Sequence, residues 1–233
     1  MTLHLYDHCP YCVRVELALG LKGLPFERKV YGYGDNLGDD SKGKYYGGST
    51  LTGKKMLPVL EISGRNPKYM GESSIIIAYL EGISADTGTP QLIPPSPVRK
   101  DLATFFASDG EFKRLQRILT RPLVIRMKHL KDWQKDEDVA YAIEKYEKAG
   151  FDYEDAERRR PEAAKRMEKL LVELEAMMQS DISMTGRGKS WDDVFTLPEL
   201  RTLSCAPDLR WPNKLRKYLD DSLKRCGVGS YFA

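Results

Sequence analysis

A cluster of prolines between residues 85 and 97 divides the sequence into two parts with different patterns. Four prolines lie within residues 90–97, and such a run can continue neither a helix nor a central strand. Before the cluster, short segments with strand and helix patterns alternate, whereas after it every long segment has the helical period. We therefore expect two domains, residues 1–84 and 98–233, joined by a linker over residues 85–97.

The first part has the pattern of one helix-covered mixed sheet. Gly23 follows an apolar helical segment, at the place where a left-handed residue commonly ends a helix. Pro58 opens a strand, at the position where its missing N–H is tolerated. The expected strands cover residues 3–6, 25–31, 58–62 and 68–70, and the expected helices cover residues 12–21, 42–46 and 72–80.

The second part is expected to be helical throughout. Its clearest segment spaces Met and Leu residues so that they form one apolar stripe, which we interpret as core. Ser190 precedes Asp193 by three residues, which is the spacing of a capping box. The stripe consists of Met167, Leu170, Leu171, Leu174 and Met178. The expected helices cover residues 98–119, 122–133, 140–148, 161–179, 191–206 and 212–224.

The composition argues against nucleic-acid and membrane partners. The net charge is +3, and the basic run at residues 158–160 is flanked by acidic residues, as on a solvated helix face. No stretch approaches the run of about 18 apolar residues that crosses a membrane. The first residues lack the pattern of a secretory signal, so we expect a reducing, cytoplasmic location.

Two of the four cysteines, Cys9 and Cys12, form a Cys-x-x-Cys motif. In a reducing compartment this motif indicates either metal binding or redox catalysis. We expect no metal, because zinc sites usually need two further ligands and the three histidines do not have zinc-finger spacing. Cys205 and Cys226 stand alone in segments with a helical pattern, and we interpret them as packing residues.

Cys9 is the expected nucleophile and Cys12 the expected resolving thiol. Cys9 lies between a strand and a helix, with Pro10 in the first helical turn, so unpaired N–H groups and the helix dipole favour its thiolate. Cys12 follows one turn later, where side chains at i and i+3 approach to about 5–6 Å between Cβ atoms. Arg14 and Lys22 are candidates for further positive potential.

Two later segments supply candidate binding groups. Leu57-Pro58 resembles the cis-proline loop of the thioredoxin fold, which would present the Leu57 main chain to an extended peptide. Glu72 and Ser73 open a helix whose free N–H groups, together with the Ser73 hydroxyl, suit a carboxylate. Ser73 is equally compatible with a simple N-cap, and both functions can coexist.

The run at residues 7–12, the pair Leu57-Pro58 and the pair Glu72-Ser73 resemble the glutaredoxins in order and spacing. The all-helical second part makes the chain similar to the glutaredoxin 2 family, whose members are built like a glutathione transferase. The resemblance implies an α/β thioredoxin-like N-terminal domain followed by an all-α C-terminal domain. A weaker likeness continues in residues 190–193, 197–198 and 211–212.

The resemblance also implies an enzyme, a glutathione-dependent thiol–disulfide oxidoreductase acting on protein or glutathione mixed disulfides. Glutathione would be its co-substrate, and its partners would be protein disulfides or glutathionylated proteins. The enzyme would be a monomer. The Leu57 main chain would bind the cysteinyl part of glutathione beside Pro58. Glu72 and Ser73 would hold the γ-glutamyl end.

Tyr11 and a basic residue, Lys55 or Lys22, would complete the implied glutathione pocket. Two departures from the family pattern bear on substrate preference. Residues 54–56 are two lysines and a methionine, where the family typically has a polar residue close before the proline. The loop over residues 32–53 is longer than usual for the family.

Three other interpretations stay open at this point. A glutathione transferase or dehydroascorbate reductase would share the architecture, although these enzymes usually keep only the first cysteine of the motif, so Cys12 argues against them. An iron–sulfur cluster could be bound between two subunits, although Pro10 is generally linked with dithiol reduction. A non-catalytic module could use the helical domain for docking, in which case the pKa of Cys9 would stay near 8.5.

Overall fold

A four-stranded mixed sheet organises the N-terminal part of the protein in this computed structural model. Strand β1 (Thr2–Leu5) lies between β2 (Glu27–Val30) and β3 (Val59–Ile62), and β4 (Lys68–Gly71) flanks β3. β1 runs parallel to β2 and antiparallel to β3, and β3 runs antiparallel to β4. The parallel pair requires a crossover, which helix α1 (Pro10–Lys22) provides. The mixed sheet predicted from the sequence is confirmed.

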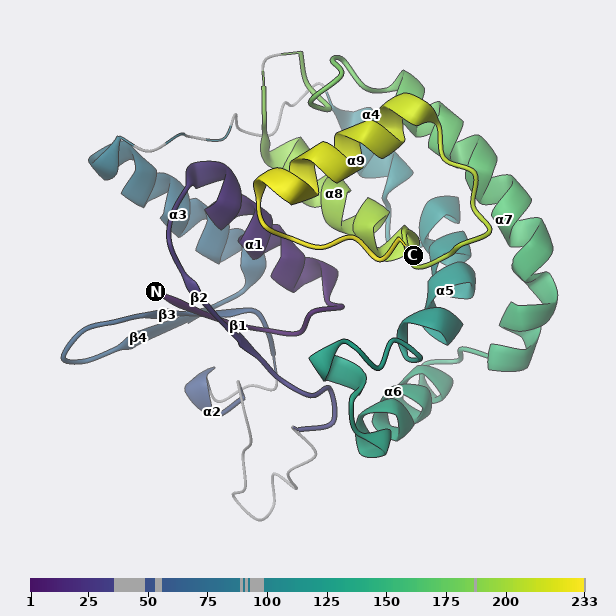
Figure 1. Cartoon of the computed structure of the whole chain (residues 1–233), viewed down its shortest axis with the longest axis horizontal. Coiled ribbons are helices and arrows are strands. Elements are labelled where there is room, and N and C mark those ends of the chain that lie inside the picture. Colours follow the sequence, from purple (N-terminus) through teal and green to yellow (C-terminus); the bar gives the residue numbers. More distant parts are fainter. Residues whose placement is uncertain are drawn as a thin grey trace. The chain divides into compact units, whose positions relative to one another are not determined.

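Helices α1 and α3 (Ser73–Thr87) pack side by side on one face of the sheet (Figure 1). Gly23 ends α1 with a left-handed backbone (φ 66°), as predicted. Gly88 (φ 70°) ends α3, so this helix extends three residues into the predicted linker. The helix continues through this proline-free stretch and ends at Gly88, because glycine tolerates positive φ. The short helix α2 (Ser49–Thr52) contacts β4.

The later part of the chain is helical, as predicted, but its helix boundaries differ from the prediction at prolines. Pro122 and Pro161 lie inside helices, although the sequence pattern placed helix starts there. The longest helix begins at residue 153, where the Asp152 carboxylate accepts a hydrogen bond from the Asp155 N–H at 2.9 Å. The helical elements are α4 (Lys100–Phe105), α5 (Glu111–Val124), the 3₁₀ turn η2 (Lys131–Trp133), α6 (Asp136–Lys148), α7 (Tyr153–Ala176), α8 (Trp191–Leu203) and α9 (Asn213–Arg225).

The structure describes residues 1–35, 49–52, 56–88, 90, 92, 99–186 and 188–232. The helix predicted over residues 42–46, and Lys54 and Lys55, lie outside these ranges. The chain forms two compact units, of which the first joins Met1–Gln91 to Ile125–Phe151 and the second joins Leu92–Val124 to Asp152–Ala233. Within the described ranges, no helix is both long and apolar enough to cross a membrane. The predicted boundaries of autonomous domains stay a prediction.

The second unit buries the predicted apolar stripe, which lies on α7 except for Met178 just after its end, and every member is at most 7% exposed. The predicted capping box at the start of α8 is also present. Asp193 Oδ2 accepts from the Ser190 N–H at 2.7 Å. The other oxygen of this fully buried carboxylate accepts from the Met184 N–H at 2.7 Å and from the Tyr218 hydroxyl at 2.7 Å. Asp193 thus ties three segments of the unit together.

Candidate active site

The strand register brings the predicted site segments to one end of the sheet. His4 of β1 pairs with Val59 of β3, and Val59 pairs in turn with Gly71 of β4. The chain therefore leaves β1 toward Cys9, enters β3 from Leu57-Pro58 and leaves β4 into Glu72, all at the same end. The Leu57-Pro58 peptide bond is cis, in agreement with the resemblance noted in the sequence.

Cys9 occupies the N-cap position of α1, directly before Pro10. Its side chain is half-buried, and its N–H donates to the Tyr6 carbonyl at 3.3 Å. The pKa of Cys9 is lowered from 9.0 to about 7, chiefly by a hydrogen bond from the Cys12 thiol. Burial opposes this change, whereas the positive charge of His8 and the N–H groups of Cys12 and Tyr11 add to it.

Cys12 has the opposite environment. Its side chain is fully buried, and its sulfur accepts from the Tyr6 N–H at 3.4 Å. Burial raises the pKa of Cys12 well above its ordinary value, and the hydrogen bond to Cys9 raises it further. One thiol of the pair thus ionises near neutral pH while the other stays protonated. This split is what sequential attack and resolution in disulfide exchange require.

An acidic network lies beside the resolving thiol. Glu16 follows Cys12 by four residues on α1 and is 2% exposed, and its negative charge contributes to the raised pKa of Cys12. Arg28 of β2 donates to Glu16 Oε1 at 2.6 Å, and it also forms an ion pair with Asp7. The network therefore links β2 to the loop that carries Cys9.

Glu72, which follows β4 at this end of the sheet, has a backbone with positive φ. It is the N-cap of α3, with φ 66° and ψ 112°, a region that residues with a Cβ rarely adopt. Its carbonyl accepts from the Ile76 N–H at 2.9 Å, and Ser73 begins the helix with 7% of its surface exposed. Because the cap position belongs to Glu72, the interpretation of Ser73 as N-cap is wrong.

Exposed apolar side chains occur on the same segments. Tyr11 is 54% exposed, Met56 40% and Ile75 56%. The guanidinium carbon of Arg14 lies 4.6 Å from the centre of the Tyr11 ring. Exposed apolar groups on segments that meet at one end of the sheet are typical of an interaction surface.

Lys22 does not belong to this site, contrary to the expectation from the sequence. It is the last residue of α1, about 18 Å along the helix from Pro10. Its buried ammonium pairs with Glu81 at 2.6 Å and donates to the Pro90 carbonyl at 3.3 Å. Lys22 therefore links the C-terminal end of α1 to the middle of α3.

Sequence reasoning missed the histidine that precedes the nucleophile and the carboxylate that holds it. His8 Nδ1 lies 2.9 Å from Asp132 Oδ1, and the Asp7 N–H donates to Asp132 Oδ2 at 3.0 Å. The Asp132 carbonyl accepts from the Tyr33 N–H at 3.0 Å. The adjacency of His8 to Cys9 was visible in the sequence, but nothing in it marked Asp132, which is 124 residues away from His8.

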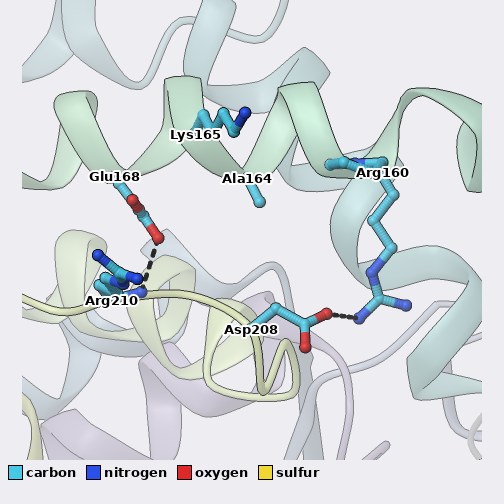
Figure 2. Close-up of a pocket in the computed structure, with 7 residues that line it drawn as sticks. Arg160, Ala164, Lys165, Glu168, Asp208 and Arg210 are labelled. Carbon is cyan, nitrogen blue, oxygen red and sulfur yellow. Dashed lines mark hydrogen bonds and ion pairs between the residues drawn. The ribbon is translucent and has the colours of Figure 1, made fainter.

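The second unit contains a hollow of about 450 Å³ between α7 and the segment before α9 (Figure 2). The Arg160 side chain donates to Asp208 at 3.0 Å across it, and the Arg210 main-chain N–H donates to the Glu168 carboxylate at 3.1 Å. Burial raises the pKa of nearby Cys205 to about 12 and that of Cys226 to about 11, so neither is an ionised nucleophile at neutral pH.

Within the described ranges, no three potential ligand side chains are grouped to hold a metal.

A thioredoxin-like sheet with a Cys-x-x-Cys at the start of α1, followed by a helical unit, defines the class of two-part proteins with glutathione-transferase architecture. Residues 8–83 match the family model of the glutathione S-transferase N-terminal domain. Residues 110–233 match the family model described as glutaredoxin 2, C-terminal domain, which covers more than half of the chain. The chain belongs to the glutaredoxin 2 family, and the fold class predicted from the sequence is confirmed.

Several relatives share this architecture. The chain is 25% identical to glutaredoxin 2 of Escherichia coli (strain K12) over 231 residues, which cover 98% of this chain and 96% of the relative. A probable glutathione S-transferase of Oryza sativa subsp. japonica is 32% identical over 101 residues, 42% of this chain and 39% of the relative. Glutaredoxin 2 of Salmonella typhimurium, solved in complex with glutathione, is similar in fold, with a TM-score of 0.79, 22% identity and coverage of 99% and 96%.

Proposed function

We propose that the protein is a glutathione-dependent thiol–disulfide oxidoreductase that uses Cys9 as nucleophile. The observation that carries this proposal is the contrast between Cys9, whose pKa is lowered to about 7, and Cys12, whose pKa is raised. A thiolate at neutral pH attacks disulfides, and a protonated neighbour waits to resolve the product. Membership in the glutaredoxin 2 family supports the same activity.

The proposed reaction begins with a protein–glutathione mixed disulfide. The Cys9 thiolate attacks the glutathione sulfur, the protein leaves as a thiolate that takes up a proton, and a Cys9–glutathione disulfide forms. A second glutathione, as its thiolate, then attacks this bond. Glutathione disulfide leaves, and Cys9 is restored as the thiolate.

With a protein disulfide as substrate, Cys12 takes the second step. Cys9 attacks and forms a mixed disulfide with the protein, and Cys12 then attacks Cys9 after losing its proton. The reduced protein leaves, and a Cys9–Cys12 disulfide remains. Two molecules of glutathione reduce this bond and depart as glutathione disulfide.

Glutathione is proposed to bind along the edge formed by the cis-proline segment and the start of α3. The Leu57 main chain, next to Pro58, would pair with the extended cysteinyl part as an added strand. The Glu72 carboxylate would bind the amino group of the γ-glutamyl end, and the Ser73 hydroxyl with the first N–H groups of α3 its carboxylate. The exposed Tyr11 ring would cover the ligand. The glutathione complex of the similarly folded Salmonella protein supports this choice of ligand.

The strained backbone of Glu72 adds support for a ligand at this position. Holding a residue with a Cβ at φ 66° costs of order 1–3 kcal/mol, and such residues cluster at ligand sites.

We further propose that the partners are glutathionylated proteins or protein disulfides, and that the protein is a cytoplasmic monomer.

The test is reduction of a small mixed disulfide by glutathione, coupled to glutathione reductase. We expect turnover by the native chain, none by Cys9→Ser, and retained deglutathionylation by Cys12→Ser. Cys205→Ser is the matched control, because Cys205 lies outside the proposed site, and it should behave like the native chain. Loss of deglutathionylation in Cys12→Ser would overturn the roles assigned to the two thiols.

A glutathione transferase is the second candidate, because the rice relative and the N-terminal family model belong to that class. Assays on the same native and variant proteins distinguish an oxidoreductase from a transferase. Conjugation of glutathione to an electrophile, without reduction of the mixed disulfide, would move the assignment to a transferase. A brown colour of the purified protein would indicate an iron–sulfur cluster, and a Cys9 pKa near 8.5 would favour a docking module.

A further inference from the structure

His8 is held by contacts on several sides, although it directly precedes a residue that has to meet substrate. Its ring centre lies 4.5 Å from that of Trp133 and 4.8 Å from that of Tyr33. The Tyr6 ring is 5.9 Å away. The His8 side chain is only 10% exposed. The ring is therefore packed against three aromatic side chains.

Asp132 provides the polar contact of this ring. Its carboxylate is fully buried in η2, and its two oxygens have different partners, His8 Nδ1 at 2.9 Å and the Asp7 N–H at 3.0 Å. An ionised carboxylate only accepts hydrogen bonds, and one of its oxygens accepts from the Asp7 N–H. With the carboxylate ionised, the hydrogen bond to the other oxygen requires a proton on His8 Nδ1.

We propose that Asp132 is a positioning residue for the nucleophile: it holds the His8 ring with Nδ1 protonated, so that the positive charge of His8 lies beside the Cys9 thiolate. Asp132 touches neither sulfur and acts only through His8. The effect of Asp132 on turnover rests on the proposed function, whereas its effect on the ionisation of Cys9 does not.

Asp132 acts on Cys9 through the orientation of the His8 ring. A fully buried carboxylate that accepts a hydrogen bond from Nδ1 fixes the direction in which the ring faces. The charge of His8 is among the causes that lower the pKa of Cys9. The other titratable groups facing the ring are the Tyr6 and Tyr33 phenols, and the Tyr33 hydroxyl accepts from Lys145 at 2.8 Å. Burial raises the pKa of Tyr33, so this phenol stays neutral near pH 7.

The same segment offers a matched control. Asp138 is also buried, at 1% exposed, and also accepts main-chain hydrogen bonds, from the Gly34 N–H at 2.6 Å and the Lys135 N–H at 3.2 Å. The bond from Gly34 attaches the start of α6 to the chain that follows β2, and the bond from Lys135 caps α6 itself. Asp138 has no hydrogen bond to His8 among the contacts described for it. Asp138→Asn therefore perturbs the same region without changing the partner of His8.

The experiment measures the pH dependence of Cys9 alkylation by iodoacetamide in the full reduced chain, with the Cys9 peptide quantified by mass spectrometry. We expect Asp132→Asn to raise the apparent pKa of Cys9 by about half a unit to one unit, which lowers the thiolate fraction at pH 6 roughly three- to tenfold. His8→Gln should give the same shift. Asp132→Asn with His8→Gln should shift no further than His8→Gln alone, because the two residues act in series. Asp138→Asn should leave the Cys9 profile unchanged.

Three results would overturn the proposal. They are an unchanged Cys9 profile in Asp132→Asn, additive shifts in the double variant, and an equal shift in Asp138→Asn. If Asp132→Asn does not fold, His8→Gln with an unchanged profile would overturn it as well. Nitrogen NMR of the native chain, labelled in histidine, adds a readout without any variant: the proposal requires a proton on His8 Nδ1, and a neutral ring protonated on Nε2 would contradict it. None of these measurements needs turnover, so failure of the proposed function would be recognised separately.

Discussion

Replacement of Cys12 by Ala or by Ser isolates the contact that most strongly ionises Cys9. The hydrogen bond from the Cys12 thiol is the largest cause of the lowered pKa of Cys9, and it acts against the effect of burial. Alanine removes this donor, whereas serine keeps an O–H in nearly the same place. The two variants therefore differ in one hydrogen bond and little else.

The expected size follows from the pKa of Cys9. At a pKa of about 7, half of Cys9 is thiolate at pH 7, and at the ordinary value of 9.0 the fraction is about 1%. His8 and the main-chain N–H groups remain in Cys12→Ala, so we expect the pKa of Cys9 to rise by about one unit and not to return to 9.0. The thiolate fraction at pH 7 then falls about fivefold.

Alkylation of Cys9 by iodoacetamide across pH 5–9 measures this fraction. Cys12→Ala should show the curve displaced by about one unit, and Cys12→Ser should stay closer to the native chain. Cys226→Ala is the matched control, because Cys226 lies in the other unit. If Cys12→Ala and the native chain gave the same curve, the Cys12 hydrogen bond would not be what ionises Cys9, and the division of roles between the two thiols would lose its basis.

Further predictions concern pH, strain, capping and the buried lysine. Below pH 7 the reaction rate of Cys9 should fall about tenfold per pH unit and above it should level off, because its lowered pKa of about 7 limits the thiolate; a pH–rate profile checks this. Glu72→Gly should relieve the positive φ and raise the free energy of unfolding by about 1 kcal/mol relative to Glu72→Ala, while both weaken glutathione binding; urea unfolding and KM for glutathione separate the two effects. Asp193→Ala should lower the free energy of unfolding by about 3 kcal/mol, because several buried donors lose their acceptor; urea unfolding measures it. Lys22→Met should destabilise the fold by about 1–3 kcal/mol by removing the ion pair of the buried ammonium with Glu81, with KM for glutathione unchanged; a raised KM would return Lys22 to the pocket.

The segment Ile125–Phe151 follows α5 in the chain but belongs to the first unit. Its attachment is polar as well as apolar. Asp132 accepts from the Asp7 N–H, and Asp138 accepts from the Gly34 N–H. The sequence pattern of this segment is helical, as in the rest of the second part, so its period carries no information about which unit it joins.

The sequence by itself determined the features that depend on near neighbours. A strand followed by Cys9 and Pro10 predicts a thiol at a helix N-terminus, because the donors and the dipole at that position arise from the helix itself. The helix stop at Gly23 and the capping box at Ser190 were predicted correctly for the same reason: each is a contact within four residues. The burial of the α7 stripe follows from its helical period alone.

Only the tertiary structure decided the features that need residues distant in sequence. His8 and Asp132 are 124 positions apart, and no spacing rule connects a loop after β1 with a 3₁₀ turn that far along the chain. The sequence offered Lys22 as a candidate for the site, but the length of α1 separates it from Cys9, and Glu81 of α3 pairs with its buried ammonium. The positive φ of Glu72 likewise arises where β4 has to turn into α3. Local sequence sets which groups are available, and long-range packing sets which of them meet, because burial removes the competing water and fixes each charge beside one partner.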